Sequence, residues 1–152
     1  MIMASPHFSM DELTFSETAI RHGIDNTPSD NEQENLYKLA MEMENVRSVL
    51  NDKSIYVSSG YRCLALNELL GSKKTSSHIK GLAADFTCRQ FGTPNEIVFA
   101  IINSKIEFDQ LILEYPDSQS GGWVHISFCE DEEVPRKQAL IINKQGTMLY
   151  SK

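Results

Sequence analysis

The chain has 152 residues, the length of one ordinary domain, and its 41% hydrophobic and 23% charged residues are typical of a globular protein with a buried core. Its 21 acidic residues outnumber 14 basic ones and give a formal net charge of −7, which argues against a protein that binds nucleic acid through general phosphate contacts. The acidity is concentrated in residues 1–50, which carry nine acids and three bases, whereas residues 51–129 carry eight and seven.

Neither a membrane span nor a secretory signal is predicted. No window approaches the roughly 18 consecutive apolar residues of a transmembrane helix, and the first residues, MIMASPHFSMDEL, lack the basic start and the apolar stretch of a signal peptide. We therefore expect a protein that is cytoplasmic as synthesised and binds no membrane. Cys63, Cys88 and Cys129 are odd in number and form no CxxC motif, so we expect free thiols and no cysteine ligands for a metal.

The first part of the chain predicts helices. Residues 8–25 favour one or two short helices that end near Gly23, and Ser29 with Glu32 matches a capping box. The strongest helix prediction runs from Asn31 to Leu50, because apolar residues recur there on one helical face: Leu36, Leu39, Met43, Val46 and Leu50.

Strands are predicted mainly in the second part. The expected elements after the long helix are a strand at 54–60, a short helix at 64–70, a helix capped by Thr93 that runs to Ser104, a hairpin of 108–115 with 123–129, and a closing hairpin of 139–143 with 147–150. No regular alternation of strands and helices occurs. The predicted fold is a small single α+β domain with a central antiparallel sheet and helices packed on one side.

Residues 76–85 place a histidine and an aspartate among small residues. Gly81 lies between His78 and Asp85 and a polar loop precedes them, which favours a tight turn followed by a strand over a helix. A carboxylate on a strand flanked by small apolar residues needs a partner charge, because burying it alone costs several kcal/mol. A metal ion would supply that charge.

A second histidine lies in the predicted strand at 123–129. On a strand, His125 shares a face with Trp123 and Ser127, while Val124 and Ile126 point to the other side. A lone histidine in a strand is more often a packed core residue than a ligand. The presence of His-x6-Asp in the same small domain reverses that preference.

Two imidazoles and one carboxylate are a ligand set typical of catalytic zinc, which keeps a fourth position for water. A structural zinc would be closed by four protein ligands, most often including cysteine. We therefore predict that His78, Asp85 and His125 bind Zn²⁺; copper and iron also accept these ligand types.

These motifs together resemble the zinc D-Ala-D-Ala carboxypeptidases and the phage endolysins grouped with them. The resemblance rests on Ser-x-His-x-x-Gly-x-Ala-x-Asp at residues 76–85, Trp-x-His at 123–125 and SGYR at 59–62, with Asn67 in the same stretch. It covers residues 8–128 and is closest to the short single-domain branch common in phages and prophages. It implies one zinc peptidase domain over residues 1–152, in which we expect residues 130–152 to end in an edge hairpin.

The resemblance also implies roles for two polar residues. It supports His78, Asp85 and His125 as zinc ligands and implies that Ser76 forms a hydrogen bond to substrate beside the metal. Arg62 would pair with a carboxylate of the substrate peptide, a role that suits its planar guanidinium better than a lysine amine. A helix-start ion pair for Arg62 and a loop cap for Ser76 are the structural alternatives.

The catalytic base departs from the family pattern. Many members place an acid three residues before the last histidine ligand, and here that position is Gly122. We choose Glu114 instead, because it ends a predicted strand whose hairpin partner would bring it across from Trp123; members of the phage-type branch resemble it in carrying a Glu at such a strand end. Asp109 and Asp117 remain alternatives.

The expected function is zinc-dependent hydrolysis of peptide bonds in bacterial peptidoglycan stem peptides, by a monomer that reaches the cell wall after release. A second hypothesis is a zinc-stabilised module that binds the wall or sits on a virion without hydrolysis, because the usual acid is missing at Gly122. A metal-independent amidase that uses Cys63 or Cys88 is a third, weaker hypothesis, since neither cysteine lies in an activating context.

Overall fold

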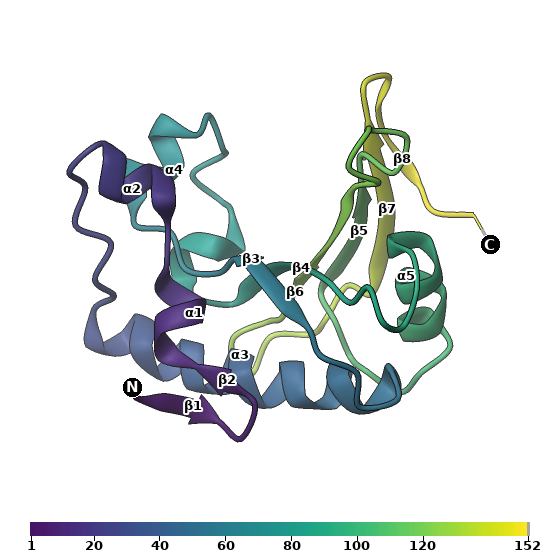
Figure 1. Ribbon diagram of the computed structural model, residues 1–152, viewed down its shortest axis with the longest axis horizontal. Helices are drawn as coiled ribbons and strands as arrows, with labels where there is room; N and C mark the ends of the chain where they lie inside the picture. Colours follow the sequence, from purple (N-terminus) through teal and green to yellow (C-terminus); the bar gives the residue numbers. More distant parts are fainter. Residues whose placement is uncertain (152) are drawn as a thin grey trace.

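The protein is described here from a computed structural model, which covers residues 1–151 (Figure 1). Its helices are α1 (Met10–Thr14), α2 (Glu17–Arg21), α3 (Asp30–Val49), α4 (Leu64–Leu69) and α5 (Pro94–Ile102), with a 3₁₀ turn η1 (Ser77–Lys80). Its strands are β1 (Met3–Ser5), β2 (Phe8–Ser9), β3 (Tyr56–Ser59), β4 (Ala83–Thr87), β5 (Gln110–Glu114), β6 (Trp123–Ser127), β7 (Gln138–Asn143) and β8 (Gly146–Leu149). The α+β prediction is confirmed.

A six-stranded sheet in the order β3-β4-β6-β5-β7-β8 forms the centre of the molecule. Both predicted hairpins, β5–β6 and β7–β8, are present and antiparallel. The expectation of an antiparallel sheet fails at one place, because β7 pairs with β5 in parallel. The chain after β6 returns to the end of the sheet where β5 begins, and there Gln138 donates its backbone N–H to the carbonyl of Asp109.

One face of the sheet is covered by α3 and α5 and forms the core (Figure 1). Alternate residues of the two central strands point into it, and Ala84, Phe86, Val124 and Ile126 are completely buried. Helix α3 contributes the apolar face that the sequence predicts, since Leu36, Leu39, Met43 and Val46, and Leu50 just after the helix, are all 0% exposed. The other face of β4 and β6 is thereby left for polar side chains.

Capping explains where the principal helices begin. Ser29 with Glu32 and Thr93 with Glu96 form the predicted capping boxes of α3 and α5, and Pro94 occupies the first turn of α5. A third box, which the sequence analysis did not identify, starts α1: Ser9 accepts a hydrogen bond from the backbone of Glu12, whose carboxylate binds the Ser9 N–H.

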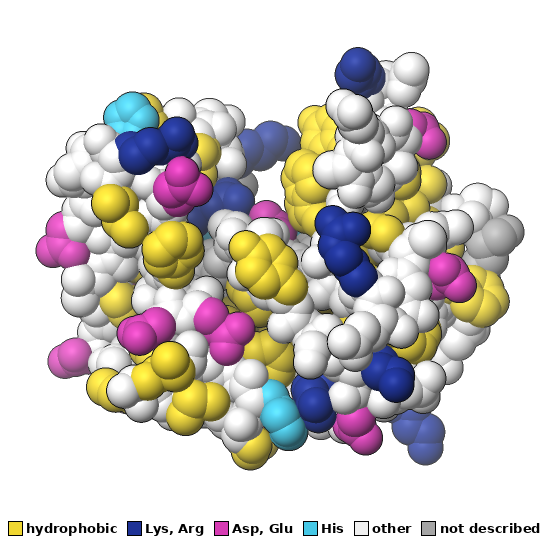
Figure 2. All heavy atoms as spheres, in the orientation of Figure 1, with side chains coloured by type: hydrophobic (Ala, Val, Ile, Leu, Met, Phe, Trp, Pro, Cys, Tyr) yellow, Lys and Arg dark blue, Asp and Glu magenta, His cyan; other side chains and the backbone are white. Residues whose placement is uncertain are grey.

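The space-filling view shows a hollow on the uncovered face, between the part that carries α2 and α4 and the part that carries β7 and β8 (Figure 2). Apolar side chains line its β7–β8 side in this view. Leu140 and Ile142 lie on this face because they pair in parallel with Ile112 and Glu114 of β5. No helix within residues 1–151 is long and apolar enough to cross a membrane.

Candidate metal centre

The two central strands bring two of the predicted ligands side by side. Asp85 in β4 and His125 in β6 are directly paired across the antiparallel ladder and point to the uncovered face of the sheet. His78 arrives from η1, which ends at Gly81 in the left-handed conformation (φ 76°) and turns the chain into β4. A Cβ at Gly81 would lie 2.9 Å from the carbonyl oxygen of Glu32, so the turn requires glycine here.

The donor atoms of His78, Asp85 and His125 all lie within 4.8 Å of one another. The Asp85 Oδ1 atom is 3.3 Å from His78 Nε2 and 2.9 Å from His125 Nδ1. The two imidazole rings meet edge to face, with centroids 5.1 Å apart. All three side chains are buried, with residue exposures of 3%, 7% and 9%. The structure therefore brings the three predicted ligands together as one candidate metal site.

A backbone carbonyl orients the first of these histidines. His78 Nδ1 lies 2.7 Å from the Gly60 carbonyl oxygen, so the Nδ1–H donates to it and Nε2 is left to face Asp85. The turn that carries Gly60 is held on both sides, because Tyr61 donates its N–H to Leu13 and Arg62 donates its N–H to the His78 carbonyl. A Cβ at Gly60 would lie 2.3 Å from the Leu13 carbonyl oxygen. The glycine of SGYR thus permits the contact that orients the ligand.

The electrostatics of the triad favour an ionised carboxylate beside neutral imidazole. Burial by itself would raise the pKa of Asp85, but the His78 and His125 rings outweigh it and hold that pKa below its ordinary value. Burial lowers the pKa of His78, against the opposing effect of Asp85. Metal binding requires these protonation states, a carboxylate and a neutral ring nitrogen.

Arg62 lies against the same carboxylate. Its Nη2 is 3.3 Å from Asp85 Oδ2, and its Nε and Nη1 donate to the hydroxyls of Ser59 and Ser72. The side chain is largely buried, with 15% exposure. Arg62 therefore holds the Asp85 oxygen that faces away from the two rings, a contact that was not predicted from the sequence. Its predicted pairing with a substrate carboxylate stays a prediction.

Ser76 lies at the N-terminal end of η1, where its hydroxyl accepts a hydrogen bond from the His78 N–H. The structure thus shows the capping contact that was weighed against a substrate role, and the substrate role stays a prediction. Asn67, from the same family stretch as SGYR, is fully buried and donates to the carbonyls of Ser72 and Lys73. These hydrogen bonds hold in place the loop that leads to Ser76.

Glu114 ends β5 directly opposite Trp123, as predicted, and Trp123 lies two residues before His125 in β6. Its Oε2 atom accepts a 2.6 Å hydrogen bond from the Trp123 indole. Burial and the negative charge of Asp85 raise the pKa of Glu114, and the smaller effects of His125 and the Trp123 hydrogen bond oppose them. This carboxylate is thus half-buried, oriented and electrostatically linked to the triad.

The two alternative acids lie in different surroundings. Asp109 accepts three hydrogen bonds from Arg136, two from its guanidinium and one from its backbone N–H. Asp117 is exposed in the loop between β5 and β6. Gly122, the position at which the resemblance described above would place an acid, has φ +80°, and a Cβ there would lie 2.3 Å from the carbonyl oxygen of Glu114. The backbone of this loop leaves no space for a side chain at residue 122.

A model of the family described as Peptidase M15 matches residues 6–127. The chain belongs to this family. A search of curated proteins found no match. M15 peptidases are zinc enzymes in general, and the buried His78, Asp85 and His125 suit such an ion, because two imidazoles and a carboxylate converge on one point. The match ends at the last residue of β6, so β7 and β8 lie outside it.

Proposed function

We propose that this M15 peptidase is a zinc-dependent enzyme that hydrolyses peptide bonds in the stem peptides of bacterial peptidoglycan, as a D-Ala-D-Ala carboxypeptidase or an endolysin-type endopeptidase. The observation that carries the proposal is the convergence of three buried donor atoms on the uncovered face of the sheet, next to a half-buried glutamate on the adjoining strand. We further propose that the protein acts as a monomer on the cell wall after release from the cytoplasm.

Each side chain has a distinct task in this proposal. His78, Asp85 and His125 would hold the zinc ion, and Arg62 and the Gly60 carbonyl keep two of these ligands in place. Zinc bound there would polarise the scissile carbonyl and make a nearby water molecule more acidic. Glu114 accepts the proton of the attacking water and returns it to the leaving amine. Trp123 fixes one carboxylate oxygen of Glu114, which leaves the other free for this transfer.

The raised pKa of Glu114 fits a general base, because a carboxylate with a higher pKa takes a proton from water more readily. The glycine at residue 122 fits as well. It lets the loop pass against the backbone of Glu114 and Tyr115, so that the acid comes from β5 rather than from the loop.

The test is release of new amino groups from purified peptidoglycan by zinc-loaded protein. We expect release that a chelator abolishes and added zinc restores. The Glu114→Gln variant should retain stoichiometric zinc and the wild-type unfolding transition, while kcat falls about 10²- to 10⁴-fold, the usual contribution of a general base. Asp117→Asn is the matched control, since it removes an exposed acid from the adjoining loop and should leave kcat unchanged.

The second candidate, a zinc-stabilised module that binds the wall without hydrolysis, gives a different result in the same assay. Such a protein would bind zinc and sediment with peptidoglycan but release no amino groups. If the Glu114→Gln protein instead kept wild-type activity, the peptidase proposal would stand, but Glu114 would not be its general base.

A further inference from the structure

A pocket of about 510 Å³ adjoins the candidate metal centre on the same face of the sheet. Its lining combines hydroxyl, amide and aromatic side chains with a single charged residue, Arg89: Ser54, Tyr56, Ser58, Thr87, Arg89, Gln90, Ser120, Gly122 and Trp123. Neither the family match nor the predicted site accounts for this pocket.

The strand register fixes its position relative to the triad. Thr87 follows Asp85 by two residues in β4, and Trp123 precedes His125 by two in β6, so both side chains lie on the metal face about 7 Å along the strands from the ligands. Tyr56 pairs with Thr87 and extends the same row to the edge strand β3. The pocket therefore begins one row of side chains away from the metal centre.

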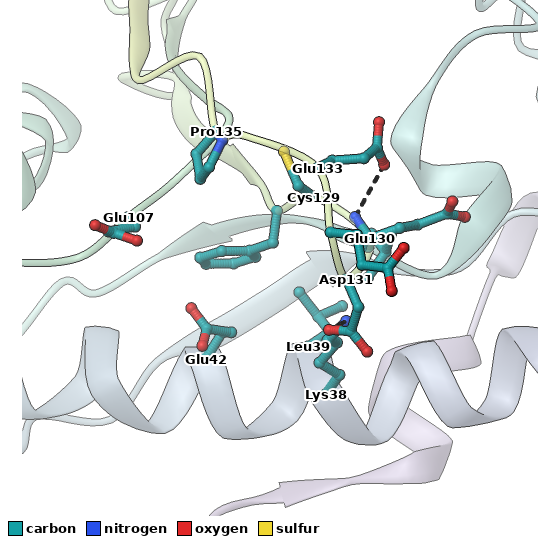
Figure 3. A pocket seen from close by; sticks show the side chains of 12 residues that line it. Lys38, Leu39, Glu42, Glu107, Cys129, Glu130, Asp131, Glu133 and Pro135 are labelled. Carbon is teal, nitrogen blue, oxygen red and sulfur yellow. Dashed lines mark hydrogen bonds and ion pairs between the residues drawn. The ribbon is translucent and has the colours of Figure 1, made fainter.

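The charge of the pocket is unbalanced. Arg89 is exposed and forms no ion pair within residues 1–151, and none of the described lining residues is acidic. A second pocket, drawn in Figure 3, differs from it, because several carboxylates lie near Lys38 there, between α3 and the segment that follows β6. There Lys38 has an acidic partner in Asp131. Arg89 has no such partner among the described residues, so its guanidinium is available to an anionic ligand.

Arg62, the arginine of the SGYR motif, differs from Arg89 because its guanidinium already has hydrogen-bond partners. Three of the Arg62 nitrogens already donate to Ser59, Ser72 and Asp85. Arg89, in contrast, belongs to the segment after β4 and lines a pocket whose hydroxyls can add hydrogen bonds to a bound carboxylate. A planar guanidinium suits such a group because it can donate two parallel hydrogen bonds to it.

We propose that this pocket binds a carboxylate of the substrate, with Arg89 as its charge partner. The inference rests on the proposed peptidase function and narrows its substrate class to peptides that carry a free carboxylate within about three residues of the cleaved bond, given the extended length of a peptide. Two carboxylates meet that description, the C-terminal one and the one left free by a γ-linked glutamate.

The chain offers a direct probe, because Trp123 is its single tryptophan and lines the pocket. We would titrate zinc-loaded Glu114→Gln protein, which keeps peptides intact, with a synthetic stem pentapeptide and follow the Trp123 fluorescence. Two further peptides, one amidated at the C-terminus and one amidated at the free carboxylate of glutamate, separate the two sources. We expect one amidation to raise Kd about tenfold, the usual value of one charge-assisted hydrogen bond.

The Arg89→Gln substitution, made in the same Glu114→Gln background, should raise the Kd of the unmodified peptide by a similar factor. The unmodified peptide and the amidated peptide that binds more weakly to Glu114→Gln should then have the same Kd. Arg89→Lys should restore part of that difference, and Lys105→Gln, which removes an exposed base beyond α5, should leave all three Kd values unchanged. Equal Kd values with and without the Arg89→Gln substitution, or no discrimination among the peptides, would overturn the inference. Discrimination without any release of amino groups by the wild type would instead refute the proposed peptidase and leave the carboxylate pocket standing.

Discussion

The two faces of β4 and β6 differ although the same strands build them in alternation. Toward α3 and α5 the strands present Ala84, Phe86, Val124 and Ile126, all completely buried in the core. Toward the hollow they present Asp85 and His125, whose polar atoms contact each other and His78. The difference teaches that the same central strands build both the core and the candidate metal site, so that substitutions on the two faces should change stability and zinc affinity separately.

The largest expected effect is on the core face. Phe86→Ala should lower the free energy of unfolding by about 3–5 kcal/mol, because it leaves a cavity beneath α3 and α5. Denaturant unfolding measures this change. The neighbouring Thr87→Ala, on the metal face, should stay within about 0.5 kcal/mol of wild type. Similar losses of unfolding free energy from the two substitutions would show that the core face does not supply more stability than the metal face.

A second prediction concerns Gly60, whose carbonyl oxygen orients His78 in the candidate metal site. Gly60→Ala forces a Cβ against the Leu13 carbonyl and displaces the backbone oxygen that orients His78. We expect zinc affinity to fall about 10- to 100-fold, the usual cost of losing such an outer contact of a ligand, as measured by competition with a chromophoric chelator. Gly92→Ala is the control, since its Cβ would meet the Glu96 side chain at the start of α5, away from the triad. Unchanged zinc affinity in Gly60→Ala would show that the Gly60 carbonyl does not contribute to zinc binding.

The smallest effect is expected where β5 and β7 begin, because the ion pair between Asp109 and Arg136 there adds to the strand pairing that joins β7 to β5. The hydrogen bonds from Arg136 hold the pKa of Asp109 below its ordinary value of 3.8. Asp109 therefore stabilises the fold above that pH, and this contribution is lost as the pH falls through the lowered value. Asp109→Asn should cost about 1 kcal/mol at neutral pH.

Urea unfolding from neutral pH to about pH 3 tests the linkage, because the difference between wild type and Asp109→Asn should begin to shrink as the pH falls below 3.8. The loss caused by Phe86→Ala has no such dependence, since burial of a phenyl ring involves no proton. A pH-independent effect of Asp109→Asn would mean that the charge of Asp109 contributes nothing to stability.

Much of the division between a core face and a metal face could be predicted from the sequence, because it follows from local periodicity. The spacing of Val124, His125 and Ile126 predicts opposite faces for ligand and core, and the strand pairing confirms it. The capping residues Ser29 and Thr93 predict the starts of α3 and α5, since a cap depends on residues only three positions apart.

The features that the sequence analysis missed depend on contacts between distant segments. Strands β1 and β2 are too short to show an alternating pattern, and the parallel pairing of β5 with β7 depends on how the chain returns after β6. The bonds from His78 to the Gly60 carbonyl and from Arg62 to Asp85 connect residues 18 and 23 positions apart. A backbone carbonyl carries no sequence signal, which is why that part of the site emerged from the structure alone.

The last hairpin has a consequence for how such an enzyme diversifies. Leu140 and Ile142 of β7 flank the hollow beside Ile112 and Glu114, yet they lie beyond the residues that match the family. The candidate metal ligands belong to β4, β6 and η1, none of which pairs with β7 in the sheet. Exchange of the β7–β8 hairpin would therefore reshape one wall of the hollow while the candidate metal ligands stay as they are, which makes this hairpin a suitable place to introduce new substrate preferences.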